Sequence, residues 1–345
     1  MKYQIIALFA VIILVLSCTS SSKSTVLEGA GATFPYPLYA EMFQEYFELT
    51  GIEINYQPIG SGAGIKKFLK KQVDFGASDI YLSDDTIRKS EINILHIPIC
   101  LGAVALSYNL PVSDTLNLSP QVISQIYRQE ITAWNDPLLA ALNPGVDLPD
   151  WDIVPLHRSD ASGTTFIFTE YLTQSDPEWR DRIGSGQKVE WTEGIAVKGN
   201  QGLADKISET EGALGYLEYN YALSKNLKVA KVLNRSGNYI FPEIENVIAS
   251  AQVDIPEDSR IILTNTEIAE GYPLSGFSWL LIYEDLDFLS NKAKAYNLVN
   301  LIWWMTHEGQ EISSKSHYGL LPEIMKIHTE KFLKKIKYNN EFIIK

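Results

Sequence analysis

The chain has 345 residues and a formal net charge of −13 at pH 7, and 46% of its residues are hydrophobic while 21% are charged. This composition is that of an ordinary globular protein, and the length exceeds what one hydrophobic core usually organises, which favours two lobes. The negative charge argues against nucleic acid and against a bare anionic membrane as partners, because both would repel the chain.

The N-terminal segment is predicted to direct export. Met1 and Lys2 give it a positive start, and the apolar run 5–16 is shorter than the roughly 20 residues that span a bilayer. Residues 15–18 (Val-Leu-Ser-Cys) resemble a bacterial lipobox, so we expect a lipoprotein signal peptide over 1–17 and a lipidated Cys18. A Ser-rich tether over 18–26 would follow. The alternative is an ordinary secretory signal with an incidental cysteine, because Leu16 stands where a smaller residue is usual.

Beyond the tether, segments typical of strands alternate with segments typical of helices, which favours α/β lobes with largely parallel sheets. The expected strands are 52–57, 94–99, 103–108, 153–156 and 277–283, and the expected helices are 37–49, 120–127, 164–172, 204–209 and 292–306. No linker of biased composition separates sequential domains, which favours lobes built from interleaved parts of the chain. Cleavage of the signal and lipidation of Cys18 would leave Cys100 as the one free thiol, so no intramolecular disulfide is expected.

The C-terminal tail, residues 326–345, is rich in lysine and includes Lys331, Lys334, Lys335 and Lys337. We expect it to present a solvated helix face with Phe332 and Ile336 packed inward, and a role at a membrane surface is the alternative.

Three stretches place small residues, hydroxyls and backbone amides directly before a predicted helix. They are Gly29–Pro35, Gly60–Gly64 and Arg158–Thr165. N–H groups at helix N-termini bind tetrahedral anions, and an arginine adds a planar pair of donors. Each stretch alone is equally typical of a cap or a turn, but together they predict one oxyanion pocket. Neither a nucleoside-triphosphate loop nor a dinucleotide fingerprint fits, since Ile65 and Phe34 stand where those motifs need other residues.

These stretches and several others, in the same order, resemble the phosphate-binding proteins of Pst-type ABC importers. The matching segments are 29–35, 59–62, 73–79, 158–164, 198–200, 212–219 and 272–275. The resemblance covers essentially the whole chain after the tether. It implies an α/β, two-lobed, periplasmic-binding-protein-like (type II) fold, in which two mixed, mostly parallel sheets are joined by crossing strands at 101–109 and 274–283. Lobe I would comprise 27–105 and 277–345, and lobe II would comprise 106–276.

The resemblance also assigns roles to residues. Phosphate would be held by Thr33, Phe34, Ser61, Asp79, Arg158, Ser162, Gly163 and Thr164. Asp160 would orient Arg158; the alternative is a salt bridge between the two at the surface. Asp79 would accept the proton of phosphate and reject sulfate, which has none; otherwise it caps a helix that begins near Ser83. Ala161 stands where the family commonly has glycine, and it would be strained if that position needs a positive φ.

The predicted function is the capture of inorganic phosphate outside the cytoplasmic membrane by an exported, lipid-anchored monomer, which delivers it to the permease and ATPase subunits of an ABC importer. A receptor for sulfate or molybdate, or a surface lipoprotein that senses phosphate or adheres, is the alternative. An enzyme such as a phosphatase is disfavoured, because the sequence has no HExxH pair, no Gly-x-Ser-x-Gly elbow and no Cys/His cluster. Neither a cofactor nor a metal is expected.

Overall fold

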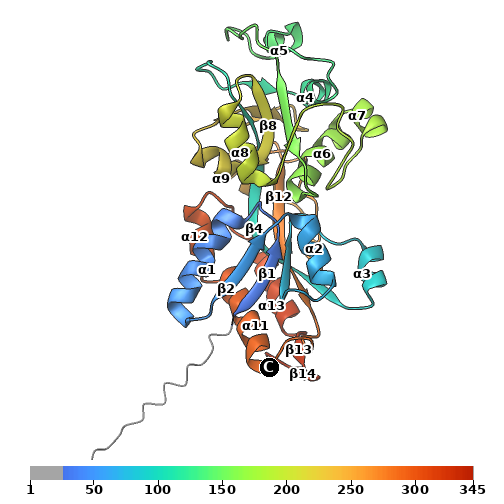
Figure 1. Cartoon of the computed structure of the whole chain (residues 1–345), viewed down its shortest axis with the longest axis vertical. Coiled ribbons are helices and arrows are strands. Elements are labelled where there is room, and N and C mark those ends of the chain that lie inside the picture. The colour runs from blue at the N-terminus through green and yellow to red at the C-terminus, as the bar shows by residue number, and fades with distance from the viewer. Residues whose placement is uncertain (1–25, 345) are drawn as a thin grey trace, which may run out of the picture.

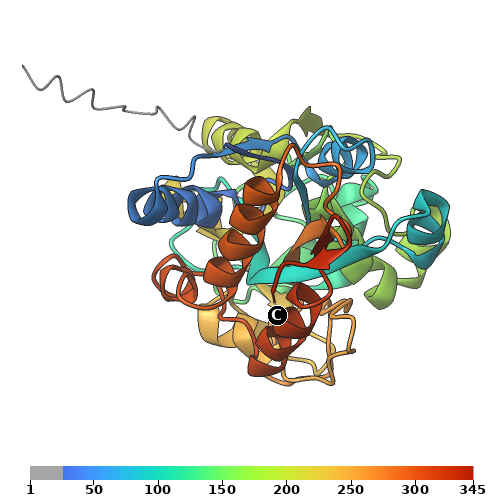
Figure 2. The same cartoon turned by 90° about the horizontal axis from the view of Figure 1, so that it is seen from below.

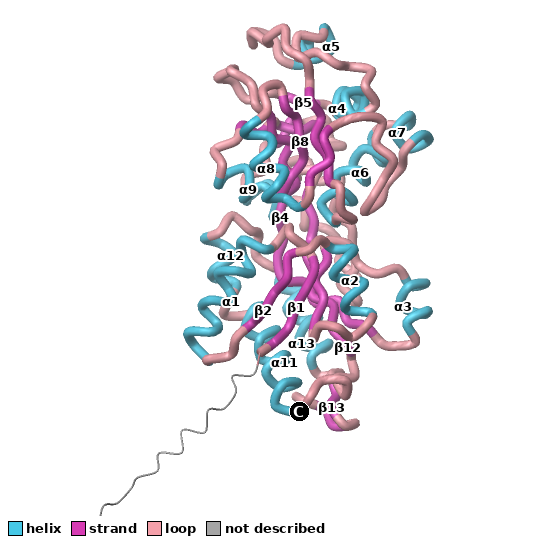
Figure 3. Tube along the Cα trace, viewed as in Figure 1, coloured by secondary structure: helices cyan, strands magenta, loops and turns pink. Residues whose placement is uncertain are grey.

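A mixed sheet runs through the protein from end to end in the computed structural model, which describes residues 26–344 (Figures 1 and 3). Within these residues it has nine strands, in the order β2-β1-β3-β12-β4-β8-β6-β7, and β9 also pairs with β4. The strands are β1 (Leu27–Gly31), β2 (Ile54–Pro58), β3 (Phe75–Ser78), β4 (Ile94–Tyr108), β6 (Val154–Arg158), β7 (Ile195–Val197), β8 (Ala213–Glu218), β9 (Lys228–Val229) and β12 (Ser275–Tyr283). Smaller sheets are formed by β5 (Asn117–Leu118), β10 (Lys231–Leu233) and β11 (Tyr239–Ile240), and by β13 (Lys337–Tyr338) and β14 (Glu341–Phe342).

Strand β4 connects the two ends of the molecule. Residues 94–103 pair antiparallel with β12, and residues 104–108 pair antiparallel with β8. Together they form a single strand in which all fifteen residues are buried. The sequence pattern instead predicts two separate strands, at 94–99 and 103–108. The expected α/β fold with two mixed sheets is confirmed, and the sheets share β4. They are not mostly parallel, because β4 and β12 pair antiparallel with every neighbour, and within these sheets parallel pairing is confined to β1, β2 and β3 and to β6, β7 and β8. The second expected crossing segment is β12, and the Val104 N–H donates to the Leu274 carbonyl just before it.

Helices flank the strands on both sides at each end (Figure 1). They are α1 (Tyr36–Thr50), α2 (Ser61–Leu69), α3 (Asp84–Ser90), α4 (Pro120–Tyr127), α5 (Pro137–Leu142), α6 (Gly163–Ser175), α7 (Pro177–Arg182), α8 (Gly199–Glu209), α9 (Tyr219–Ser224), α10 (Ile244–Ala249), α11 (Lys292–Thr306), α12 (Gln310–Lys315) and α13 (Glu323–Leu333). Helices α4 and α11 have the bounds expected from the sequence. No helix within residues 26–344 is both long and apolar enough to cross a bilayer.

The chain is interleaved in space. Elements that precede β4 and follow β12 gather at the lower end of Figure 1, whereas α4 to α9 lie at the upper end. Viewed from below, the red C-terminal helices lie across the lower end (Figure 2). The lobe boundaries stay a prediction, and the segment around Arg260 belongs sequentially to lobe II but contacts lobe I, since Arg260 Nη1 lies 2.6 Å from Asp84 Oδ1. The lipidation prediction for Cys18 concerns a residue outside the described part of the chain.

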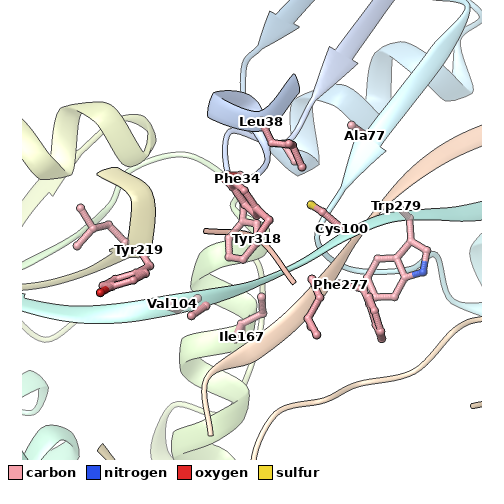
Figure 4. Close-up of a cluster of buried hydrophobic side chains, with 14 of the residues drawn as sticks. Phe34, Leu38, Ala77, Cys100, Val104, Ile167, Tyr219, Phe277, Trp279 and Tyr318 are labelled. Atoms are coloured by element: carbon pink, nitrogen blue, oxygen red, sulfur yellow. The ribbon is translucent and has the colours of Figure 1, made fainter. Parts of the chain in front are cut away.

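A buried apolar cluster fills the junction between the two ends (Figure 4). It combines residues of the lower end, such as Phe34 and Trp279, with Ile167 of α6 at the upper end. Phe332 and Ile336 are also buried, which confirms their predicted inward packing in the C-terminal tail. The hydrophobic core is therefore continuous through the junction, and the polar groups described below lie beside it.

A buried ion pair joins the helices of the upper end. Arg128, which follows α4, donates from Nη1 to Asp176 Oδ2 at 2.9 Å and to Ser124 Oγ at 2.8 Å. Asp176 lies between α6 and α7, and it also caps α7 by accepting from the Glu178 N–H. Loss of the guanidinium would leave Asp176 buried without its cation.

We predict that Arg128→Met lowers the free energy of unfolding by about 3–5 kcal/mol, because one partner of a buried ion pair is removed. Denaturant unfolding measures this change. The matched control is Arg88→Met, which removes an exposed arginine paired with Asp85 and should change stability by less than the error of the measurement. Equal effects of the two substitutions would contradict a structural role for the buried pair.

Candidate functional site

The stretches selected from the sequence meet where β1, β3 and β6 end. Thr33 and Phe34 follow β1, Asp79 follows β3, and residues 158–164 run from the end of β6 into α6. Hydrogen bonds connect the lower and upper ends here. The Gly62 N–H donates to the Ala161 carbonyl at 3.1 Å, and Asn200 Nδ2 donates to Thr33 Oγ1 at 3.0 Å. The carboxyl ends of strands in α/β sheets are the usual place for a ligand.

Tyrosines hold the loop between β1 and α1. The Tyr221 hydroxyl donates to the Thr33 carbonyl at 2.7 Å, and the Tyr318 hydroxyl donates to the Phe34 carbonyl at 2.8 Å. Both tyrosines are buried, and they come from α9 and from the segment before α13. With its carbonyls engaged in this way, the loop has a fixed orientation in which the Thr33 hydroxyl faces Asn200.

The first turn of α6 supplies further donors. Ser162 is its N-cap, and its Oγ accepts from the Thr165 N–H at 3.2 Å, so the capping role considered for this stretch is confirmed. The hydroxyl hydrogen of Ser162 is not used by that bond. The N–H groups of Gly163 and Thr164 stand in the first turn, where helical geometry provides no intrahelical acceptor. Gly163 also packs tightly, because a Cβ there would lie 2.5 Å from Asp79 Cβ.

Arg158 is buried and fixed by Asp160. Its Nε and Nη2 donate to the two Asp160 oxygens at 2.8 and 2.6 Å, which leaves Nη1 directed to Thr164 Oγ1 at 3.4 Å. Arg158 is only 3% exposed, so the alternative of a surface salt bridge is wrong. Burial alone would raise the pKa of Asp160, but the hydrogen bonds from Arg158 and from the Gly199 N–H outweigh it and hold that pKa below its usual value. Asp160 therefore stays ionised and orients the guanidinium.

Gly60 and Ala161 allow this close approach of the two ends. Gly60 has a φ of +92°, and a Cβ there would lie 2.4 Å from Asp160 Oδ2. Ala161 does not have a positive φ, so the strain considered for alanine at this position does not arise. Its methyl group instead packs against Gly62, where an added Cβ would lie only 2.5 Å from Ala161 Cβ.

Asp79 places a carboxylate directly against this group of donors. Ser278 Oγ donates to its Oδ1 at 2.8 Å, and Ser61 Oγ donates to its Oδ2 at 3.2 Å. Burial raises the pKa of Asp79 to about 7, although both serines and the charge of Arg158 act in the opposite direction. Ser83, not Asp79, caps the next helix, because Ser83 Oγ accepts from the Thr86 N–H. The capping alternative for Asp79 is therefore wrong.

Sequence reasoning assigned no role to four neighbours of the site, although three of them stand in or beside family-like segments. They are Asn200, Glu218, Ser278 and Tyr318. Glu218 is fully buried, and burial raises its pKa to about 8 while the Asn220 N–H and Nδ2 donate to its carboxylate. Ser278 reaches Asp79 only through the antiparallel pairing of β12 with β3, a contact between residues 199 positions apart. Neither spacing nor local pattern carries a signal for that contact.

The predicted site residues therefore lie together, and their roles in binding remain predictions. Residues 26–344 contain no cluster of three or more His, Cys, Asp or Glu side chains that could hold a metal ion. The arrangement offers hydroxyl, amide and guanidinium donors to one small anion, with the Asp79 carboxylate among them as acceptor.

Comparisons of sequence and of structure with known proteins lead to phosphate-binding proteins and to the PBP superfamily domain. A family model for the PBP superfamily domain matches residues 19–297. The phosphate-binding protein PstS of Pasteurella multocida is 34% identical over 317 residues, which is 90% of this chain and 91% of that protein. Among solved structures, the phosphate-binding protein from Stenotrophomonas maltophilia has a TM-score of 0.70 at 18% identity, over 89% of this chain and 93% of that one. An ABC-type phosphate transport receptor from Vibrio cholerae has a TM-score of 0.56 at 16% identity, over 86% and 100% of the respective chains.

The raised pKa of Asp79 predicts a pH dependence of stability. A folded-state pKa of about 7, above the ordinary aspartate value of 3.8, means that the stability contributed by the protonated carboxyl is fully present below pH 4 and is lost as the pH rises through 7. In phosphate-free buffer, the parent should therefore lose stability relative to Asp79→Asn between pH 4 and 7, by an amount on the order of a few kcal/mol.

Chemical unfolding of both proteins across this range measures the difference. The control is Asp85→Asn: because Lys89 and Arg88 hold the pKa of the exposed Asp85 below its usual value, Asp85 titrates below this range, and the difference between that variant and the parent should stay nearly constant from pH 4 to 7. A parent-to-variant difference that does not change with pH would show that Asp79 is hydrated in the folded protein.

Proposed function

The chain belongs to the phosphate-binding protein (PstS) family of the PBP superfamily, and we propose that it captures inorganic phosphate outside the cytoplasmic membrane and delivers it to an ABC importer. The observation that carries this proposal is the convergence of many donors on one point that also has a buried carboxylate acceptor. The proposed ligands of phosphate are the eight residues expected from the sequence: Thr33, Phe34, Ser61, Asp79, Arg158, Ser162, Gly163 and Thr164.

The balance of donors and acceptors favours phosphate over other tetrahedral oxyanions. Hydroxyls, amides and the free edge of Arg158 would pair with the anion oxygens. At neutral pH phosphate retains at least one proton, which it can donate to Asp79, whereas sulfate has no proton to offer. Above pH 7, where Asp79 is ionised, its carboxylate held against a sulfate oxygen leaves a buried and repulsive contact without compensation. The same carboxylate counts against a sulfate or molybdate receptor.

Closure of the two lobes is the proposed conformational step. Donors from both ends of the molecule would act on one anion, since Thr33 and Ser61 belong to the lower end and Arg158 and Thr164 to the upper end. Phosphate would therefore stabilise the closed form, which has the Gly62–Ala161 hydrogen bond. The hinge would lie in β4 and at the start of β12, where the chain passes between the two ends. The closed monomer would then present phosphate to the permease and ATPase subunits.

We propose binding without catalysis. Phosphate-ester hydrolysis needs an activated nucleophile or a metal. The nearest histidine in sequence, His157, stacks on Trp191 with ring centroids 4.8 Å apart, and burial lowers its pKa. Its Nδ1 contacts the Arg158 carbonyl, and no hydrogen bond joins it to a site serine or threonine among the described residues. Transport fits this arrangement better than acyl or phosphoryl transfer.

We predict that Asp79→Asn admits sulfate. The amide can donate its N–H to a sulfate oxygen, so sulfate affinity should rise by at least about tenfold as the repulsive contact is removed. Phosphate affinity should change less, because the amide oxygen still accepts the phosphate proton. Calorimetric competition of sulfate against phosphate measures both values.

The matched control for this substitution is Asp74→Asn. Asp74 is a buried aspartate at the opposite end of β3, where it accepts from the Glu28 N–H and pairs with Lys294. It should leave sulfate excluded. Continued exclusion of sulfate by a folded Asp79→Asn protein would disprove the role of Asp79 in selection.

Export and anchoring through Cys18 complete the proposal, with the protein held at the cell membrane or in the periplasm. Cys18→Ser should move the protein from the membrane fraction to the soluble fraction and leave phosphate affinity unchanged, because the tether expected over 18–26 would separate Cys18 from the proposed site. Fractionation of cells that express either form, followed by calorimetry, measures both effects. Equal membrane association of the two forms would contradict lipidation at Cys18.

A further inference from the structure

Asn200 lies behind two of the proposed phosphate donors. It occupies the first turn of α8 and is fully buried. Its Nδ2 is 3.0 Å from Thr33 Oγ1 and 3.2 Å from Thr164 Oγ1. These two threonines belong to opposite ends of the molecule, so Asn200 is the shared neighbour of a proposed donor from each end.

The orientation of the Asn200 amide is determined by the backbone. Its Oδ1 accepts from the Glu218 N–H at 3.1 Å, at the end of β8. A backbone N–H can only donate, so the atom that faces Glu218 must be the amide oxygen. The NH₂ group therefore faces the threonines, and it has one hydrogen for each hydroxyl oxygen.

This orientation determines the direction of both hydroxyl hydrogens. A hydroxyl has one hydrogen and two acceptor lone pairs, and Asn200 occupies a lone pair of each threonine. At Thr164 the Arg158 Nη1 approaches the same oxygen at 3.4 Å, as a second donor. The Thr164 hydrogen is then left for a third group, which must be an acceptor. The anion proposed to bind here is such a group.

We infer that Asn200 is a positioning residue that directs the hydroxyl hydrogens of Thr33 and Thr164 toward bound phosphate. This inference rests on the proposed function and adds a residue that does not itself touch the ligand. Donors that already point at the anion need no rotation when it binds, which increases affinity. An aspartate at this position would reverse the arrangement, because its oxygens would accept the hydroxyl hydrogens and turn them away from the proposed anion position.

If Asn200 only held the two ends together through its hydrogen bonds, the substitutions would have different effects. The carboxylate introduced by Asn200→Asp could still hydrogen bond to both threonines and keep the two ends connected, whereas Asn200→Ala would lose this connection. Asn200→Ala would then bind phosphate more weakly than Asn200→Asp. If Asn200 instead directs the hydroxyl hydrogens, the order of phosphate affinities is the opposite. Alanine leaves the hydroxyls free to rotate toward phosphate, whereas aspartate accepts their hydrogens. The added charge of aspartate must be separated from this effect.

The experiment compares both variants in two backgrounds. Phosphate affinity is measured by calorimetry for the parent, Asn200→Ala and Asn200→Asp, and again for each in a protein that also carries Thr33→Val and Thr164→Val. Variants that bind weakly are measured from the rise in melting temperature with phosphate concentration, which gives Kd by linkage. Ligand-free melts establish that every variant is folded.

In the parent background, Asn200→Ala should bind about tenfold more weakly than the parent, and Asn200→Asp about a hundredfold more weakly than Asn200→Ala. In the valine background no threonine hydroxyl remains, so only the added charge separates the two variants. The ratio of the Kd of Asn200→Asp to that of Asn200→Ala should therefore be at least about tenfold smaller than in the parent background. Should Asn200→Asp fail to fold, the alanine substitution still decides, because it should cost affinity only where the threonines are present.

The inference would be overturned if the ratio of the two variants' Kd values were the same in both backgrounds, or if Asn200→Ala lowered phosphate affinity equally in both. Either result would leave the proposed function intact. Failure of the parent to bind phosphate would instead overturn the proposed function together with this inference.

Discussion

The structure depends on the hydrogen bonding of one strand, β4, to both ends of the molecule. Nine of its first ten residues pair with β12, its last five pair with β8, and all fifteen are buried. Because both sheets share this strand, the ends of β1, β3 and β6 come to the same junction without a separate linker. The apolar cluster around Phe34 and Ile167 packs against this strand (Figure 4). A shared strand can bend while it keeps both ladders, which makes it a suitable hinge.

Local dipoles, not overall charge, explain how such an acidic protein could bind an anion. The chain carries a net charge of −13, but salt screens that field within roughly 8 Å at physiological ionic strength. Within the site, Arg158 is neutralised by Asp160, so the pair supplies fixed N–H donors with little net charge. Asp79 and Glu218 are both buried with raised pKa values. On the proposed function, such a site would exchange hydrogen bonds with phosphate and would depend on the proton that phosphate carries.

The sequence predicted the elements with strong local signals and missed those that depend on long-range contacts. Helices α4 and α11 begin directly after the caps Ser119 and Asn291, and their expected bounds agree with the structure. Helix α8 begins five residues before the expected start, because Gly199, Asn200 and Gly202 weaken its helical pattern. Strands β1 and β3 consist largely of small residues, which give little strand signal. The site loops were found from their composition, but Ser278 and Asn200 reach the site through tertiary contacts between residues 199 and 167 positions apart.

The most direct test of this account is a crystal structure of residues 26–345 grown with phosphate. The account predicts one tetrahedral anion between the two ends, with oxygens within hydrogen-bonding distance of Arg158 Nη1, Ser61 Oγ and the Thr164 N–H, and one oxygen beside Asp79. It also predicts that Asn200 Nδ2 remains bonded to both threonines without touching the anion. An anion bound elsewhere, or a complex in which Asp79 faces away from it, would contradict the account.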